Sequence, residues 1–127
     1  MEELELLIPE QIVESLPEDG EDVRRDMTQA VAGWESDVNA ALSADEDDEA
    51  IGAVLDLLEH FEGRWEAYDE YVVELRAWGQ SPIYAIAWRN LYAELIARIY
   101  DHDQLGEALD RERNQRLVED GIRFGGS

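Results

Sequence analysis

Apolar residues recur through residues 51–75 at steps of three and four positions, and this spacing constrains the fold more than any other feature of the sequence. The stripe consists of Ile51, Leu55, Leu58, Phe61, Trp65, Tyr68, Val72 and Leu75. Such steps place side chains on one face of an α-helix. The pattern predicts one helix over about residues 49–78, with the stripe either in the protein core or in contact with a second copy.

Turn residues separate this helix from four further helical segments. A short helix is expected between Pro9 and Pro17, and a longer one over about residues 21–42. The run Gly79-Gln80-Ser81-Pro82 predicts a glycine cap, then a serine N-cap and a proline in the first turn of the next helix. That helix, about residues 82–100, is apolar on almost every side. It is therefore expected at the centre of a bundle or beneath another subunit.

Glycines mark two further positions. Gly63 lies in the middle of the long helix and is expected to mark a kink or a close approach. The last helix is expected to end near residue 120, because Gly121 followed by Ile122 suits a left-handed cap, with residues 121–127 as a short tail. The sequence thus predicts an all-α protein. Residues 1–127 would form a single helical domain, a bundle of four main helices plus a short N-terminal helix.

The chain is strongly acidic. Its 32 Asp and Glu residues and 10 basic residues, all of them arginine, give a formal net charge of −22. High net charge is typical of disorder, but four tryptophans and the regular apolar spacing favour a packed core. At molar salt the Debye length falls to about 3 Å, so self-repulsion is largely screened. The composition favours a protein adapted to high salt, although a GC-rich genome would also replace lysine with arginine.

No residue pattern predicts catalysis, and we expect neither a cofactor nor a metal. Neither His60 nor His102 follows a glutamate by three positions, as the metal sites of helical bundles require. Asp101-His102-Asp103 fits a polar loop better than a cation site. The net charge argues against specific nucleic-acid binding, and no apolar run is long enough to span a membrane. The sequence predicts a non-enzymatic protein of an aqueous compartment.

Charge is distributed unevenly along the chain. Residues 1–82 hold 24 acids and 4 arginines, a net of −20, whereas residues 83–127 hold 8 acids and 6 arginines, a net of −2. Arginine is favoured at protein interfaces. We therefore expect an acidic partner or a neighbouring copy to bind Arg111, Arg113, Arg116, Arg123 and Phe124. The alternative is pairing within the last helix, with Glu107, Asp110, Glu112 and Glu119.

The elements follow a distinctive order. A short segment, Ile8 to Leu16, precedes an acid-rich turn, Pro17 to Asp22, and a helix containing Ala30-Val31-Ala32-Gly33-Trp34. An apolar helix from Pro82 to Tyr100 and a charged final helix complete the chain. This order resembles the head–tail adaptor (connector) proteins of tailed viruses.

The resemblance implies a homo-oligomeric ring, typically of twelve copies, between the portal and the tail or stopper protein of a virus that infects a halophilic archaeon. The C-terminal segment would contact the portal, and DNA would pass through an acidic lumen. The protein would be assembled in the host cytoplasm and reside in the virion. The alternative is a host cytosolic scaffold or regulatory module that dimerises through the 51–75 stripe.

Overall fold

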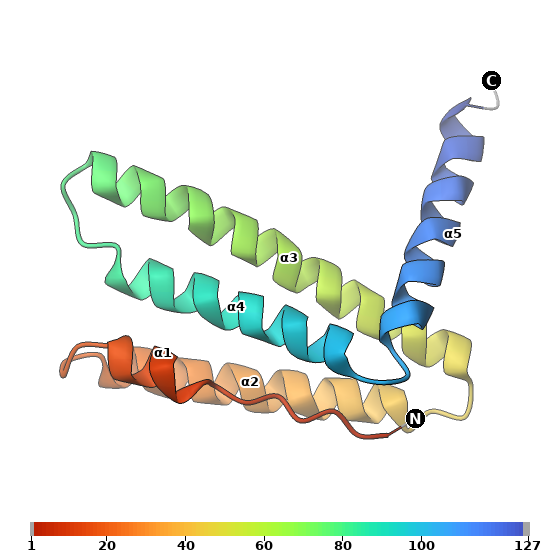
Figure 1. Cartoon of the computed structure of the whole chain (residues 1–127), viewed down its shortest axis with the longest axis horizontal. Helices are drawn as coiled ribbons and strands as arrows, with labels where there is room; N and C mark the ends of the chain where they lie inside the picture. The colour runs from red at the N-terminus through yellow and green to blue at the C-terminus, as the bar shows by residue number, and fades with distance from the viewer. Residues whose placement is uncertain (1, 126–127) are drawn as a thin grey trace.

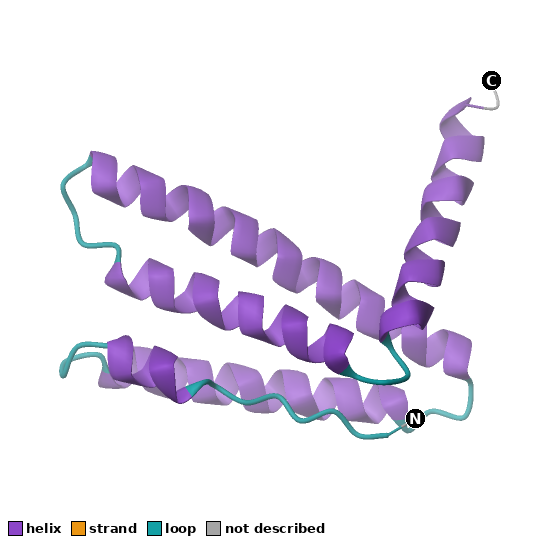
Figure 2. Ribbon diagram, viewed as in Figure 1, coloured by secondary structure: helices purple, strands orange, loops and turns teal. Residues whose placement is uncertain are grey.

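A computed structural model of the chain describes the backbone of residues 2–125 and the side chains of residues 2–119. This part contains five helices and no strand: α1 (Glu10–Ser15), α2 (Glu21–Leu42), α3 (Asp47–Ala77), α4 (Ile83–Asp101) and α5 (Gly106–Gly125). Helices α2, α3 and α4 run along the long axis of the molecule, and α5 diverges from them (Figure 1). The predicted all-α fold is confirmed (Figure 2).

The core forms where α2, α3 and α4 meet. Phe61 of α3 is fully buried and packs edge-on against Trp34 of α2, with ring centroids 5.0 Å apart. Tyr92 of α4 closes the cluster at 5.9 Å from Phe61. Because α4 packs against α1, α3 and α5, most of its apolar surface is covered within one chain, although Ile83 and Tyr84 in its first turn are 41% and 38% exposed. The central position predicted for this helix is therefore found without a second subunit.

The turn between α3 and α4 contains the predicted glycine cap. Gly79 has a φ of 74°, in the left-handed region that favours glycine. Its N–H donates to the carbonyl of Arg76 at 3.1 Å, and the N–H of Gln80 donates to the carbonyl of Leu75 at 2.8 Å. This pair of hydrogen bonds is the Schellman motif. The motif satisfies the last carbonyls of α3 and reverses the chain into α4.

The predicted start of α4 is wrong by one residue. Ser81 was expected as the N-cap, but Pro82 occupies that position and no side chain caps the helix. The carbonyl of Pro82 accepts the N–H of Ile86 at 2.8 Å, so the first helical hydrogen bond closes one residue later than the pattern indicated. A proline suits this boundary because it has no N–H to leave unsatisfied.

The close approach expected at Gly63 and the cap expected at Gly121 are not found. Gly63 lies inside α3, and apart from the adjacent residues and backbone of its own helix no atom lies within 4 Å of the position that a Cβ would take, so the expected close approach does not occur there. Helix α5 continues through Gly121 to Gly125, which removes the predicted cap and most of the predicted tail over residues 121–127. A glycine lowers helix stability by about 1 kcal/mol but does not end a helix unless the backbone turns left-handed.

Candidate assembly site on helix α5

Buried apolar side chains attach the N-terminal half of α5 to the bundle. Leu105 and Leu109 are 0% and 1% exposed, and Ala108 is buried beside them. The turn that leads into the helix is tight, because a Cβ on Gly106 would lie 3.2 Å from the carbonyl oxygen of Tyr100. The chain therefore changes direction sharply after α4, and α5 leaves the bundle at a steep angle (Figure 1).

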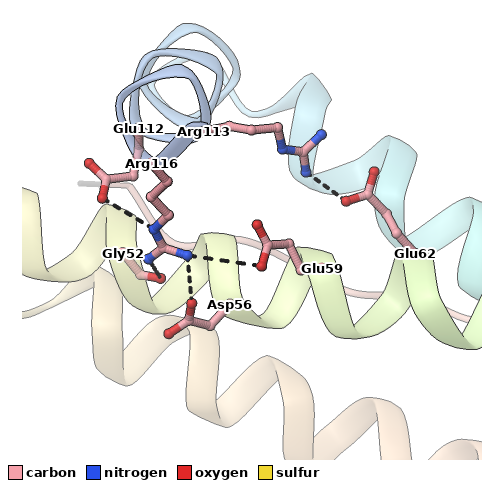
Figure 3. Close-up of polar contacts among 7 residues, drawn as sticks. All are labelled: Gly52, Asp56, Glu59, Glu62, Glu112, Arg113 and Arg116. Carbon is pink, nitrogen blue, oxygen red and sulfur yellow. Dashed lines mark hydrogen bonds and ion pairs between the residues drawn. The ribbon is translucent and has the colours of Figure 1, made fainter. Parts of the chain in front are cut away.

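Two of the predicted partner-binding arginines instead contact α3 of their own chain. A terminal nitrogen of Arg113 lies 2.6 Å from a carboxylate oxygen of Glu62. Arg116 donates to Asp56 at 2.8 Å and to the carbonyl of Gly52 at 3.4 Å (Figure 3). These contacts join residues that are 51, 60 and 64 positions apart in the sequence. They fix the side of α5 that faces the bundle.

The alternative prediction, pairing within the last helix, is met at one position. Arg116 lies 3.5 Å from Glu112 on α5, besides 4.0 Å from Glu59 on α3. The other three acids proposed for such pairing form no ion pair among the described side chains. The arginines thus form a small network between helices, which neither sequence-based alternative included.

The ion pairs position α5 more than they stabilise it. The hydrogen bond to Asp56 raises the pKa of Arg116, and burial opposes this increase. Burial lowers the pKa of Arg113 and is the largest single effect, but the charges of Glu62, Tyr100 and Glu59 and the hydrogen bond to Glu62 together raise the net pKa. Both guanidinium groups therefore stay charged. Because their side chains are 31% and 34% exposed, each pair contributes about 1 kcal/mol or less.

The outer face of α5 is exposed. Leu117 and Val118 are 62% and 61% exposed, and Arg111 forms no ion pair with any described side chain. Arg111 and Val118 are seven residues apart, so they share one helix face. The C-terminal half of α5 extends beyond the other helices (Figure 1). The side chains of Arg123 and Phe124, which were also predicted to bind a partner, lie outside the described residues.

The apolar stripe of α3 lies mainly in the core. Ile51 and Tyr68 are partly exposed and Trp65 is 38% exposed, whereas the other five stripe residues are buried: Leu55, Leu58, Phe61, Val72 and Leu75. The stripe therefore packs α3 against its own chain. A dimer formed through the whole stripe would have to expose this core.

The two histidines have structural partners. His60 packs at 6.3 Å from the ring of Trp34. Nδ1 of His102 accepts the N–H of Gln104 at 3.2 Å, so its Nε2 is the donor to the carbonyl of Glu2 at 2.8 Å. Among the described residues, no group of three or more His, Asp or Glu side chains is placed to hold a metal ion.

The extended segment that precedes α1 was not predicted from the sequence. Asn39 of α2 accepts the N–H of Leu4 at 2.8 Å and donates to its carbonyl at 3.1 Å. Glu35 accepts the N–H of Leu6 at 2.9 Å, and both leucines are buried. The alternation Leu4-Glu5-Leu6 is the sequence signal for this segment, because alternate residues of an extended chain point to the same side.

Together these features define a small all-α bundle with a projecting, arginine-bearing C-terminal helix. The chain belongs to DUF7971, a family of unknown function whose profile matches residues 1–126. No curated protein and no solved structure gives a significant match. Within the part that the structure describes, no helix is both long enough and apolar enough to cross a membrane.

Proposed function

We propose that this protein is a non-catalytic assembly protein that joins copies of itself through the outer face of α5. The position of α5 carries the proposal. Its N-terminal half is fixed to the bundle, whereas Leu117 and Val118 are more than half exposed beyond it. An isolated helix shorter than about 12–15 residues is only marginally stable in water. A projecting helical end with exposed apolar side chains is therefore typical of a segment that packs on a partner.

The distribution of charge supports a second copy as that partner. Residues 1–82 carry a net charge of −20, and the outer face of α5 carries Arg111 together with the exposed apolar side chain of Val118. This face complements the acidic surface of another copy. Such a contact joins two different surfaces, and contacts of this kind form a ring when the rotation between copies closes.

The specific form that we propose is a head–tail adaptor ring, typically of twelve copies, in the virion of a tailed virus that infects a halophilic archaeon. The order of the elements along the chain supports this form. The acidic composition supports it too, because an acidic lumen repels phosphates and lets DNA slide. The outer face of α5 would contact the neighbouring copy. The end of the chain, with Arg123 and Phe124, would contact the portal, and the tail or stopper protein would bind on the opposite side.

The mass of the assembly in molar KCl tests the proposal. Light scattering after size exclusion would compare the full chain with a chain that ends at residue 116. This truncated chain retains Leu105, Leu109, Arg113 and Arg116, so it should keep its helical circular dichroism. We expect the full chain to assemble and the truncated chain to be monomeric. A full chain that stays monomeric at every concentration would refute the proposal, and a stable dimer would refute the ring.

Two single substitutions separate the α5 face from a general effect of charge. Val118→Asp adds one charge to the outer face and should dissociate the assembly. Gln29→Asp adds the same charge at an exposed position of α2 and should leave the mass unchanged. Equal losses in both variants would show that added charge, rather than the α5 face, controls assembly.

A further inference from the structure

A surface groove is lined by residues of α3 and by one residue of α4. Its volume is about 510 Å³, and its lining residues are Glu62, Trp65, Glu66, Asp69, Glu70 and Ile96. The indole of Trp65 is 38% exposed, although this residue belongs to the apolar stripe of α3. The groove therefore combines an accessible aromatic ring and an aliphatic side chain with four carboxylates.

Only part of this negative charge is compensated. Arg113 pairs with Glu62 at 2.6 Å, and Arg89 pairs with Asp69 at 3.0 Å. Glu66 and Glu70 have no arginine partner among the described side chains. They are four residues apart and thus lie on the same side of α3, one turn from each other.

A guanidinium group fits this chemistry. Its planar fork donates to carboxylates, and its face stacks on an indole ring. An ammonium group would make the charge contact without the planar fit, and the chain contains no lysine. The aliphatic lining from Ile96 offers contact to an apolar side chain beside the cation. The expected occupant is a helix that presents an arginine and an aliphatic residue on one face.

The outer face of α5 has this composition. Arg111 and Val118 are separated by about 10 Å along the helix, and the lining from Glu62 to Glu70 extends over about 12 Å of α3. The two surfaces of one chain do not meet, because Arg113 and Arg116 hold the opposite face of α5 on α3 (Figure 3). The outer face is therefore free to reach the groove of another copy.

We propose that the Trp65 groove of one copy receives the outer face of α5 from a second copy, with Arg111 between Glu66 and Glu70. This inference rests on the proposed self-assembly and names its receiving surface. The contact pairs two different surfaces, so every copy carries both a donor helix and an acceptor groove.

Charge reversal tests the pairing. Arg111→Glu and Glu66→Arg are each expected to raise the Kd of self-association by about tenfold or more, because each places like charges together. The double variant, Arg111→Glu with Glu66→Arg, should recover most of the affinity. The control for Glu66→Arg is Asp26→Arg, which makes the same change from a negative to a positive charge at an exposed site of α2 and should change the Kd little. Analytical ultracentrifugation measures all four variants, and circular dichroism checks that each one is folded.

Cross-linking between mixed chains gives a second readout. The chain has no cysteine, so Asn114→Cys and Glu66→Cys can each supply one thiol. A short bis-maleimide added to an equimolar mixture should produce a covalent dimer. The yield of covalent dimer should be much lower when either cysteine variant is treated alone. The matched control replaces Glu66→Cys with Asp26→Cys.

The outcomes separate this inference from the proposed function. If the full chain assembles and truncation at residue 116 dissociates it, but the groove variants assemble normally, then α5 docks elsewhere and the groove inference is overturned. Failure of the double variant to recover affinity, together with the absence of a mixed cross-link, has the same consequence. A full chain that never assembles overturns both proposals.

Discussion

Replacing Leu109 with alanine is predicted to lower the free energy of unfolding by about 2–5 kcal/mol, the range for such a change in a packed core. Leu109 is 1% exposed and reaches the core from α5. Arg116→Gln instead removes ion pairs of a side chain that is 34% exposed, and its three carboxylate partners are 71%, 50% and 30% exposed. These pairs share one guanidinium and are screened at molar salt, so together they are worth about 1 kcal/mol or less. The buried leucine should therefore dominate the attachment of α5.

Thermal unfolding of dilute protein, followed by circular dichroism at one fixed molar salt concentration, measures this difference. For a chain of 127 residues, 1 kcal/mol shifts the Tm by about 3–5 °C. Leu109→Ala should then lower the Tm by about 6–25 °C, and Arg116→Gln by about 5 °C at most. Leu117→Ala is the matched control. It makes the same change on the same helix at a site that is 62% exposed, and it should stay within about 0.5 kcal/mol of the parent.

An equal fall in Tm for Arg116→Gln and Leu109→Ala would contradict this prediction. The ion pairs would then hold α5 in place, and its attachment would depend strongly on salt. A loss at Leu117 equal to that at Leu109 would mean that the distal half of α5 folds back onto the bundle in solution.

Four further predictions follow from particular residues. Gly79→Ala should lower the free energy of unfolding by about 1–2 kcal/mol, because the φ of Gly79 is 74°. Gly63→Ala should raise it by up to about 1 kcal/mol, because the space at the Cβ position is open. Equal Tm values for the two variants would contradict this contrast. Asn39→Ala removes both hydrogen bonds to Leu4, so limited proteolysis should cut faster before α1, and an unchanged rate would count against the role of Asn39. Burial raises the pKa of Tyr92 above 10.0, so its contribution to stability is complete below pH 10.0 and is lost as the pH rises through the folded-state pKa. The Tm should therefore fall less at high pH in Tyr92→Phe than in the parent. Lowering the salt from molar to tens of millimolar extends the Debye length from about 3 Å to beyond 10 Å and should lower the Tm sharply; a salt-independent Tm would contradict adaptation to high salt.

Much of the fold was accessible from the sequence, because it depends on local rules. The spacing of apolar residues from Ile51 to Leu75 identifies α3, and Gly79 identifies its end. The errors are local as well. Gly121 continues α5 instead of ending it, because a glycine only weakens a helix unless tertiary packing also requires a left-handed turn.

The candidate site was accessible only in part. Arg113 and Arg116 were identified as interaction residues, but their partners Glu62 and Asp56 lie 51 and 60 positions away, beyond any helical spacing. The chain contains 32 acids, so the sequence cannot select among them. The hydrogen bonds of Asn39 to the extended N-terminal segment were missed for the same reason, since they connect residues 35 positions apart.

The helical class, the positions of the main helices, the apolar stripe of α3 and the concentration of negative charge before residue 83 all follow from the amino-acid sequence. These properties follow from hydrogen bonds and side-chain periods within a few residues. The direction of α5, the partners of its arginines and the face that stays exposed depend instead on tertiary packing. Those properties depend on how Leu105 and Leu109 pack into a core that is formed mainly by three other helices. Packing of this kind joins residues distant in sequence, and no local pattern encodes it.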